Sequence, residues 1–533
     1  MDRQPRARGL SGWLRAPWVW IMGVSIAAVT AAMLYALRLP YWFDEANTIY
    51  YVQQPFFRML KFVANDFSPP LYYFILRLWA VGFGTSELAS GSLSFILYFA
   101  AAVFTYRLGC RLFGPSVAAG AVVLLWVSYA ALYFATETRM YALLTVLAAA
   151  STERVVALLQ GDRRRFAVFA YGLVTLAGLY THYVFWFLVV AQNLAVGLWN
   201  RRWSQPQGWR YGAVQLGLIS AYVPQVPILW DRIAHWYLSP TSSWANISRV
   251  SFDLFWQLPA GLLLRGDQEL FLGRLAFVVG VAVLALLLLT WVRVELGWRL
   301  KAVRVELRPF DPSVALLLLL ITVPLTLFYI LNVQELRYAS FLNPFFCLVV
   351  ARGVSAGVSV ARQPAMLAGL VGLIATVNTA SAFRAPLHYE NIAWPAVAKF
   401  LVAQPDSGGT VIAAHYDDSI VLSYYYRGPL SIVRLSPLPL VAGEDRAVEE
   451  IRAVGRLVVT PESLDHVVAQ LAAVQSVWYV RGPSAAFFDH DQLLWALLWR
   501  HCTLGSIYEF SGRPMRHFNP LRVAEFRQCQ FPS

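Results

Sequence analysis

Residues 17–52 read "PWVWIMGVSIAAVTAAMLYALRLPYWFDEANTIYYV", an apolar run that ends in two adjacent carboxylates. The part from Trp18 to Leu37 has the length, ~20 residues, that crosses a bilayer as a helix. It is longer than the apolar core of a cleavable signal peptide, which has roughly 7–15 residues. We therefore expect an uncleaved first transmembrane helix that brings Asp44 and Glu45 to the membrane surface.

The composition of the whole chain agrees with a membrane protein. Of 533 residues, 58% are hydrophobic and only 14% are charged, whereas about 25% of the residues in a soluble domain are charged. Apolar runs long enough to span a bilayer recur along most of the chain. Eleven predicted spans lie near residues 18–38, 88–109, 115–134, 141–159, 166–181, 183–199, 210–230, 269–291, 313–331, 338–357 and 364–382. The predicted fold class is a polytopic α-helical membrane protein.

The basic residues, which give the chain a net charge of +13, gather in short loops between apolar spans. Membrane proteins retain Lys and Arg on the cytoplasmic side, so this pattern explains the charge without a nucleic-acid partner. A cytoplasmic N-terminus places every basic cluster on the cytoplasmic face, namely Arg111, Arg163 to Arg165, Arg201 with Arg202, Arg293 to Arg308, and Arg352 with Arg362. We therefore expect a multi-pass protein of a bacterial inner (cytoplasmic) membrane, with its chemistry on the outer face.

Two outer stretches are predicted to lie outside the bilayer core. In the segment 39–87, "PFFRMLKFVAN" and "PPLYYFILRLWAVGFG" are typical of helices that lie along the membrane interface. After residue 383, strand-like and helix-like patterns alternate as in a small α/β domain. The predicted domains are a transmembrane catalytic domain, 1–383, and an extracytoplasmic α/β domain, 384–533. In the latter, Cys502 and Cys529 form a disulfide if the compartment is oxidising and otherwise remain thiols.

Asp44 and Glu45 are the first candidates for chemistry. An acidic pair at the end of a span is usually only a surface feature. Here aromatic residues flank the pair and place it in the membrane interface, where an idle charge is poorly solvated: Tyr41, Trp42, Phe43, Tyr50 and Tyr51. A carboxylate held at such a place can act as a general base towards a hydroxyl group.

Further polar residues stand at the outer ends of spans, namely Asp66, Glu137, Arg139, Tyr141, His182, Arg337 and Tyr338. Each alone has an ordinary explanation, such as a turn residue, a helix-start pair, an interfacial histidine or a snorkelling arginine. Together they suit a lipid-linked phosphate substrate. Arginine binds phosphate in a fixed fork, tyrosine donates to phosphate oxygens, and an acid removes the proton of an attacking group.

Four of these stretches carry a family resemblance: "FDEANTIYY", "DFSPPLYYFILRLWAVGFGTSE", "ETRMYALL" and "ELRYASFLNP". The chain resembles bacterial C-type (GT-C) glycosyltransferases of the group that includes protein O-mannosyltransferases and the aminoarabinose transferase of lipid A. The resemblance covers nearly the whole chain. It implies transfer of a sugar from a polyprenyl-phosphate donor to an extracytoplasmic lipid, glycan or protein acceptor, with inversion at the anomeric carbon.

The resemblance also implies roles for the residues. Asp44 corresponds to the general base, Glu45 and Asp66 position the acceptor or shape the pocket, and Glu137 lies in the substrate site. The phosphate leaving group is assigned to Arg139, Tyr141, Arg337 and Tyr338. His182 assists binding of the substrate or of a divalent metal, the one cofactor that the resemblance raises; its ligands are unknown.

The chain departs from the family pattern in front of its double proline. The aminoarabinose branch has a glutamate and a lysine there, and many mannosyltransferases have a histidine, whereas this chain has Phe67 and Ser68. A phosphate-binding lysine is therefore missing, which argues against aminoarabinose as the sugar. Binding of phosphate rests on the arginines instead.

The alternative class is a membrane transporter or flippase of a lipid-linked or anionic substrate. Transporters place ionisable residues near the bilayer midplane, often on broken helices of repeated halves. The middle of the spans is uncharged here, as in "VALLLLLITVPLTLF", and the sequence shows no repeated halves. The loop "HWYLSPTSSWANIS" and the outer domain are expected to help select the acceptor.

Overall fold

The computed structural model describes residues 17–66, 68–162, 164–199, 205–236, 292–297, 302–307, 311–331, 335–357, 363–384, 393–404, 409–435, 459–482, 489, 492–510 and 521–531. The predicted span 269–291 and loop residues 237–268 fall outside these ranges. Packing divides the chain into two units. The first comprises Met1–Leu37, Gly91–Val223 and Ser248–Arg384, and the second comprises Arg38–Ser90, Pro224–Ile247 and Ala385–Ser533.

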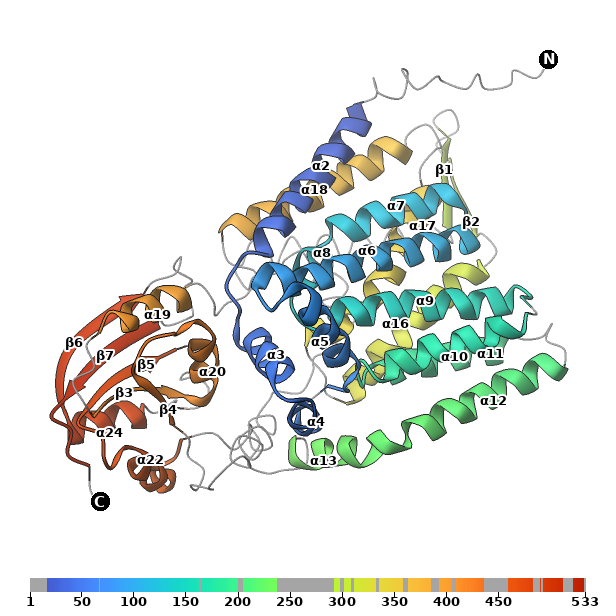
Figure 1. Ribbon diagram of the computed structural model, residues 1–533. Helices are drawn as coiled ribbons and strands as arrows, with labels where there is room; N and C mark the ends of the chain where they lie inside the picture. The colour runs from blue at the N-terminus through green and yellow to red at the C-terminus, as the bar shows by residue number, and fades with distance from the viewer. Residues whose placement is uncertain are drawn as a thin grey trace, which may run out of the picture. The chain divides into compact units, whose positions relative to one another are not determined.

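The first unit is mainly helical (Figure 1). Its elements are α2 (Pro17–Ala36), α6 (Glu87–Leu112) from Gly91 onward, α7 (Pro115–Val127), α8 (Tyr129–Phe134), α9 (Tyr141–Leu159), α10 (Arg165–Leu179), α11 (Phe185–Trp199), α12 (Gln205–Tyr222), β1 (Val292–Gly297), β2 (Ala302–Leu307), α16 (Pro312–Ile330), the 3₁₀ helix η3 (Leu336–Leu342), α17 (Asn343–Gly357) and α18 (Gln363–Arg384). Every predicted span except 269–291 coincides with a described helix or with consecutive helices, as 210–230 does with α12, η1 (Val223–Gln225) and α13 (Val226–Trp236).

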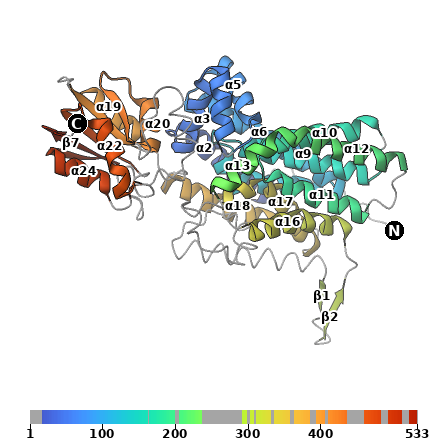
Figure 2. The same ribbon diagram turned by 90° about the horizontal axis from the view of Figure 1, so that it is seen from below.

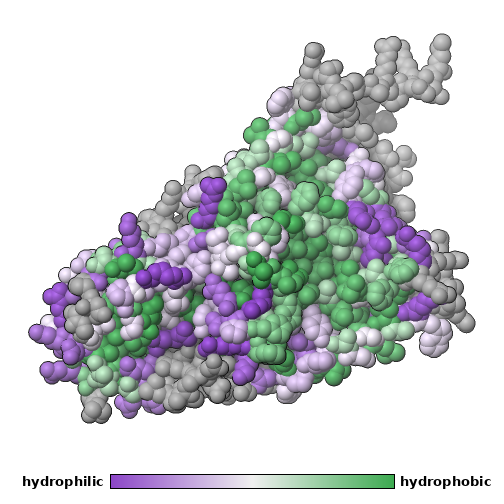
Figure 3. Space-filling model, in the orientation of Figure 1, coloured by the Kyte–Doolittle hydropathy of each residue, from purple (hydrophilic) through white to green (hydrophobic). Residues whose placement is uncertain are grey.

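Among the described residues, seven helices are long and apolar enough to cross a membrane, and four shorter helices are also apolar. The surface over the helices of the first unit is correspondingly hydrophobic (Figure 3). Because a helix in a bilayer satisfies its own backbone hydrogen bonds, such helices are the expected way to span it. The chain is a multi-pass membrane protein, as the sequence predicted.

The predicted single span 115–134 is divided at Ser128 into α7 and α8. Ser128 is extended, with φ −66° and ψ 154°, and its hydroxyl accepts the N–H of Ala131 as the N-cap of α8. The side-chain amide of Asn378 donates to the Val127 carbonyl at 2.9 Å, and that of Asn343 donates to Ser128 Oγ at 2.9 Å. These two asparagines satisfy groups that the break exposes, which lipid could not do.

Helices α9, α10, α11 and α12 lie side by side in the first unit (Figures 1 and 2). Polar contacts join α9, α10 and α11 within their apolar interface. Ser151 Oγ lies 2.9 Å from Thr175 Oγ1, and Gln192 Nε2 donates to Ser151 Oγ and Thr152 Oγ1 at 3.1 Å each. Interhelical hydrogen bonds of this kind fix the register of membrane helices.

Strands β1 and β2 form an antiparallel hairpin inside the basic stretch Arg293 to Arg308, which was expected to be only a loop. In the backbone register of the hairpin, Arg293 pairs with Glu306, and Glu295 pairs with Arg304. The alternation of valine with charged residues in "VRVELG" and "AVRVEL" is the period-two signal for these strands.

The second unit contains the outer segment and the C-terminal α/β domain. Its elements are α3 (Phe43–Gln53), α4 (Phe56–Asn65), α5 (Leu71–Phe83), α13 (Val226–Trp236), α19 (Trp394–Val402), β3 (Thr410–His415), α20 (Tyr416–Tyr425), β4 (Ser431–Leu435), η5 (Pro461–Ser463), α22 (Leu464–Leu471), β5 (Ser476–Arg481), α24 (Leu493–His501), β6 (Thr503–Phe510) and β7 (Leu521–Arg527); η1 (Val223–Gln225) lies at the boundary of the units. The predicted interfacial helices are α4 and α5. Helix α3 was not predicted.

The C-terminal sheet has the strand order β4-β3-β5-β7-β6. β3 is parallel to β4 and β5, whereas β7 is antiparallel to β5 and β6. Its core contains Tyr479 and Phe526, packed with Leu494 and Leu498 of α24. Burying each such side chain contributes about 1.5–3 kcal/mol. This is the α/β domain that the sequence predicted.

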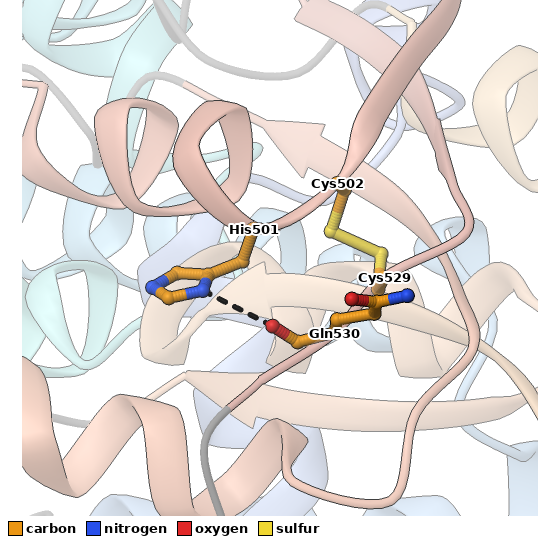
Figure 4. Close-up of a disulfide and its surroundings, with 4 residues drawn as sticks. All are labelled: His501, Cys502, Cys529 and Gln530. Carbon is orange, nitrogen blue, oxygen red and sulfur yellow. Dashed lines mark hydrogen bonds between the residues drawn. A yellow bond between two sulfur atoms is a disulfide. The ribbon is translucent and has the colours of Figure 1, made fainter.

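A disulfide closes the end of this domain. Cys502, directly after α24, is bonded to Cys529, two residues after the end of β7 (Figure 4). Beside it, His501 Nδ1 lies 3.1 Å from the Gln530 carbonyl oxygen. The structure thus forms the bond that the sequence left open.

Candidate active site

The adjacent acids Asp44 and Glu45 have different surroundings in the first turn of α3. Glu45 is buried, and its Oε2 accepts the backbone N–H of Trp42, the N-cap residue, at 3.3 Å. This contact satisfies an N–H group that the helix itself leaves without a hydrogen bond. The positive end of the helix dipole stabilises the negative charges of both carboxylates. Asp44 is only partly buried. Glu45 therefore supports the helix, and Asp44 remains the candidate for chemistry.

Asp66 ends helix α4 and is buried. Its Oδ2 accepts a hydrogen bond from the hydroxyl of Tyr73 on α5. The Tyr73 ring lies 5.9 Å from the ring of Tyr51, whose hydroxyl accepts from Asn47 Nδ2 at 2.9 Å. A chain of polar and aromatic contacts thus joins Asp66 to Asn47, one helical turn from Asp44 on α3.

The ends of the outer segment are fastened to helix α20 of the C-terminal domain. Tyr425 Oη accepts the backbone N–H of Tyr41 at 2.7 Å and donates to Glu87 Oε1 at 2.7 Å. The Thr85 carbonyl accepts from the hydroxyl of Tyr41 at 3.0 Å and from that of Tyr424 at 2.9 Å. The start and the end of the segment that carries Asp44 are therefore held together by the same tyrosines.

The remaining predicted residues gather at one end of the first unit, where η3 packs against the start of α9. Tyr141 begins α9, His182 lies in the turn between α10 and α11, and Arg337 and Tyr338 belong to η3. The His182 ring is 4.9 Å from the Tyr338 ring and 6.1 Å from the Tyr141 ring, and the two tyrosine rings are 6.5 Å apart. We call these residues, together with Glu137 and Arg139, the His182 cluster.

The charges of the His182 cluster come from Glu137, Arg139 and Arg337. Glu137 and Arg139 are buried, and both lie within electrostatic range of Tyr141, as does Arg337. The Glu137 carbonyl accepts from Ser94 Oγ at 2.6 Å, which ties α6 to this turn. Arg337 lies over the Tyr338 ring and pairs with the partly exposed Glu335 at 3.4 Å, a contact that solvent screens.

His182 is neutral at physiological pH. Burial, reinforced by the positive charges of Arg139 and Arg337, lowers its pKa to about 3. Its Nδ1 accepts the backbone N–H of Val184 at 3.2 Å. The ring proton of the neutral form therefore sits on Nε2, which makes His182 a hydrogen-bond donor. Two arginines, two tyrosines and this N–H give the cluster the donors that a phosphate group requires.

A divalent metal does not fit these residues. Over the part of the chain that the structure describes, no group of three or more His, Cys, Asp or Glu side chains could hold a metal ion. His182 uses Nδ1 to accept a hydrogen bond, so its neutral ring has no lone pair to offer a metal. No chemical step is therefore assigned to a metal here.

The structure thus brings six of the predicted residues together in the first unit, whereas Asp44, Glu45 and Asp66 belong to the second. Sequence reasoning missed Tyr73, Tyr424 and Tyr425. The run "SYYYRG" held a signal, because a buried tyrosine hydroxyl usually finds a partner. Its partners lie more than 330 residues away in the chain, which no local pattern reveals.

The fold is that of the C-type (GT-C) membrane glycosyltransferases. The chain matches the crystal structure of ArnT from Cupriavidus metallidurans in the apo state, with a TM-score of 0.55 and 15% identity over 97% of this chain and 98% of that chain. It matches ArnT of the same organism bound to undecaprenyl phosphate equally, with a TM-score of 0.55, 14% identity and the same coverage of both chains.

A third similar structure is the arabinofuranosyltransferase AftD from Mycobacteria, with a TM-score of 0.49 and 13% identity over 96% of this chain and 40% of that chain. No protein-family model matches the sequence, and no curated protein matches it. The predicted fold is therefore confirmed by structure rather than by sequence similarity.

Proposed function

We propose that this protein is a glycosyltransferase that moves a sugar from a polyprenyl-phosphate donor to an extracytoplasmic acceptor. The observation that carries the proposal is the His182 cluster, which unites arginine, tyrosine and neutral histidine donors on a GT-C fold. The similar ArnT structure with bound undecaprenyl phosphate supports a lipid phosphate as the ligand class.

The His182 cluster binds the phosphate of the donor. Arg139 and Arg337 stabilise the negative charge that grows on phosphate as the glycosidic bond breaks, and Tyr141 and Tyr338 donate to its oxygens. Arg139 and Tyr141 are buried, and Arg337 and Tyr338 are partly buried in η3. Electrostatic stabilisation of this kind is usually the largest contribution to lowering a reaction barrier.

Asp44 acts as the general base. It removes the proton from an acceptor hydroxyl, whose oxygen attacks the anomeric carbon of the sugar. The bond from that carbon to the phosphate oxygen breaks, and polyprenyl phosphate leaves with the electron pair, which inverts the anomeric configuration. Glu45 holds Asp44 in place by capping α3, and Asp66 shapes the same segment through Tyr73.

We propose that the active site lies on the extracytoplasmic face of a bacterial inner membrane and that the N-terminus lies in the cytoplasm. Placement of the basic loops supports this orientation. The disulfide between Cys502 and Cys529 supports it independently, because such bonds persist in oxidising compartments and are rare in the cytosol. The acceptor is an envelope lipid, glycan or protein.

The test is transfer of sugar from a polyprenyl-phosphate donor by the purified protein in nanodiscs. We expect Asp44→Asn to abolish transfer while the protein still binds the donor and remains folded. Asp465→Asn is the matched control, because Asp465 is an exposed acid on α22. Mass spectrometry then compares the envelope glycans and glycolipids of cells that carry the gene with those of cells that lack it. The molecule that loses one sugar is the acceptor, and the missing sugar is the one transferred.

Full activity of Asp44→Asn would remove Asp44 from the mechanism. The protein is also reconstituted into liposomes of the same lipid composition. Movement of intact lipid-linked sugar across the liposome membrane, with no new glycosidic bond, would instead establish a flippase. These two results are distinguishable, because the first retains a glycosylated product and the second never yields one.

A further inference from the structure

A second charged cluster lies further along α9 and belongs to no part of the proposed reaction. Glu153 has a fully buried side chain, and three arginines surround it. Its Oε1 accepts from Arg111 Nε at 2.7 Å and lies 3.5 Å from Arg107 Nη2, while its Oε2 pairs with Arg154. We call these four residues the Glu153 cluster.

The positive charge of the Glu153 cluster is not balanced within it. Three guanidinium groups face one carboxylate, which leaves an excess of two positive charges. Asp162 lies within electrostatic range of Arg154 and is hydrogen-bonded by Arg164 at 2.9 Å and 2.7 Å, so including both Asp162 and Arg164 leaves the excess at two. Excess positive charge near a membrane surface attracts anionic groups. The cluster therefore calls for an anion.

The Glu153 cluster is separate from the His182 cluster. Tyr141 and Glu153 are both on α9, twelve residues apart, which is about 18 Å along a helix that rises 1.5 Å per residue. A donor phosphate held beside Tyr141 is too distant to contact these arginines. The anion at the Glu153 cluster is thus a different molecule.

The surface that leads to the cluster suits an acyl chain. On α6, apolar side chains recur at helical spacing and remain exposed, namely Ile96, Phe99, Val103 and Tyr106. Arg107 follows this stripe directly, and its side chain is 51% exposed. In Figure 3 a hydrophilic patch borders the hydrophobic surface where α6 and α9 end. A lipid lying along the stripe would bring its headgroup to Arg107.

We propose that the Glu153 cluster binds the phosphate of an anionic membrane phospholipid. The exposed fork of Arg107 contacts the phosphate oxygens, while Arg111 and Arg154 keep Glu153 paired and add positive potential. A zwitterionic lipid carries a positive group that opposes this potential, so an anionic headgroup binds more tightly. The bound lipid also joins α6 to α9, which stabilises the helical unit.

In the experiment, the full chain in detergent is titrated with phosphatidylglycerol or with phosphatidylcholine of the same acyl chains. Native mass spectrometry measures the bound lipid, and thermal unfolding measures the midpoint temperature. We expect phosphatidylglycerol to bind and to raise the midpoint more than phosphatidylcholine. Arg107→Gln should weaken phosphatidylglycerol binding about fivefold, since one basic residue at an anionic surface is worth ~1 kcal/mol.

Arg107→Gln keeps Arg111 and Arg154 on Glu153, so the variant is expected to fold. Arg210→Gln is the matched control, because Arg210 is an exposed arginine on α12 outside the cluster. Equal binding of the two lipids, or unchanged phosphatidylglycerol binding by Arg107→Gln, would overturn the proposal. An identical midpoint shift with inorganic phosphate alone would also overturn it, because the ligand would then be the free anion.

Discussion

The phenolic oxygen of Tyr425 accepts a hydrogen bond from the backbone N–H of Tyr41 at 2.7 Å, across 384 residues of sequence. Tyr41 lies three residues before Asp44, so the C-terminal domain holds the start of the helix that carries the proposed base. Burial, reinforced by the negative charge of Glu87, raises the pKa of Tyr425. Its hydroxyl is therefore a protonated donor to Glu87 throughout the physiological pH range.

Replacing Tyr425 by phenylalanine should loosen this attachment. The variant removes the hydrogen bonds to Tyr41 and Glu87, and a hydrogen bond to a charged group contributes about 1.5–3 kcal/mol. We expect a lower thermal midpoint and a lower kcat, with donor Kd unchanged, because the donor contacts lie elsewhere. Tyr508→Phe, at a partly exposed tyrosine of β6, is the control. A variant with normal kcat would show that the attachment does not position Asp44.

Arg337→Ala should weaken donor binding. A charge-assisted hydrogen bond worth about 1.5–3 kcal/mol corresponds to a loss of roughly 10- to 150-fold in affinity. Binding of a polyprenyl phosphate in nanodiscs measures this directly. Arg522→Ala is a matched control, since Arg522 also pairs with a glutamate, Glu509, at 2.8 Å but lies in the C-terminal sheet. An unchanged donor affinity in Arg337→Ala would exclude Arg337 from the phosphate site.

His182 should make stability depend on pH. Its folded-state pKa is about 3, against 6.5 for the ordinary side chain. Between these values the unfolded chain binds more protons than the folded one, so stability falls as pH drops below about 6.5 towards about 3, with a limiting slope of roughly 1.4 kcal/mol per pH unit.

Thermal midpoints of the wild type and His182→Gln across this pH window test the assignment. The wild type should lose more stability than the variant as the pH falls, and the two profiles should run parallel above pH 7. Parallel profiles throughout would mean that His182 is solvated or charged in the folded protein. Donor affinity, in contrast, should not change between about pH 7 and 8, because the neutral ring is present throughout that range.

The sequence predicted the membrane helices, and for a shared physical reason it grouped the residues of the His182 cluster in one set with Asp44, Glu45 and Asp66. Apolar runs of bilayer length locate the helix ends, and the alternation of basic loops indicates which ends meet on one face. Glu137, His182 and Arg337 could therefore be grouped without any knowledge of packing. The α/β domain was also predictable, because its strands and helices carry different hydrophobic periods.

What the sequence could not predict depends on contacts between distant segments. The break at Ser128 persists because Asn343 and Asn378 satisfy its polar groups, and both lie more than 200 residues further along the chain. The sequence also did not show that Glu45 accepts the backbone N–H of Trp42, because this contact requires helix α3 to begin at Phe43. The partner of Tyr425 follows from tertiary packing alone.

The disulfide gives a prediction about both stability and orientation. Cys502 and Cys529 are 27 residues apart in sequence, and closing a loop of that size stabilises a protein by about 3–4 kcal/mol in the chain-entropy account. The double variant Cys502→Ser/Cys529→Ser should therefore lower the thermal midpoint of the full chain. Cys110→Ser, at a free and partly buried cysteine, should not.

The single variant Cys529→Ser then reports the side of the membrane. It leaves the Cys502 thiol unpaired, and a membrane-impermeant maleimide should label that thiol in intact spheroplasts, because the C-terminal domain is proposed to be extracytoplasmic. Cys110→Ser in the same background removes any signal from Cys110 and makes the labelled site unambiguous. Labelling that requires permeabilised membranes would place the domain in the cytoplasm and reverse the orientation of every span.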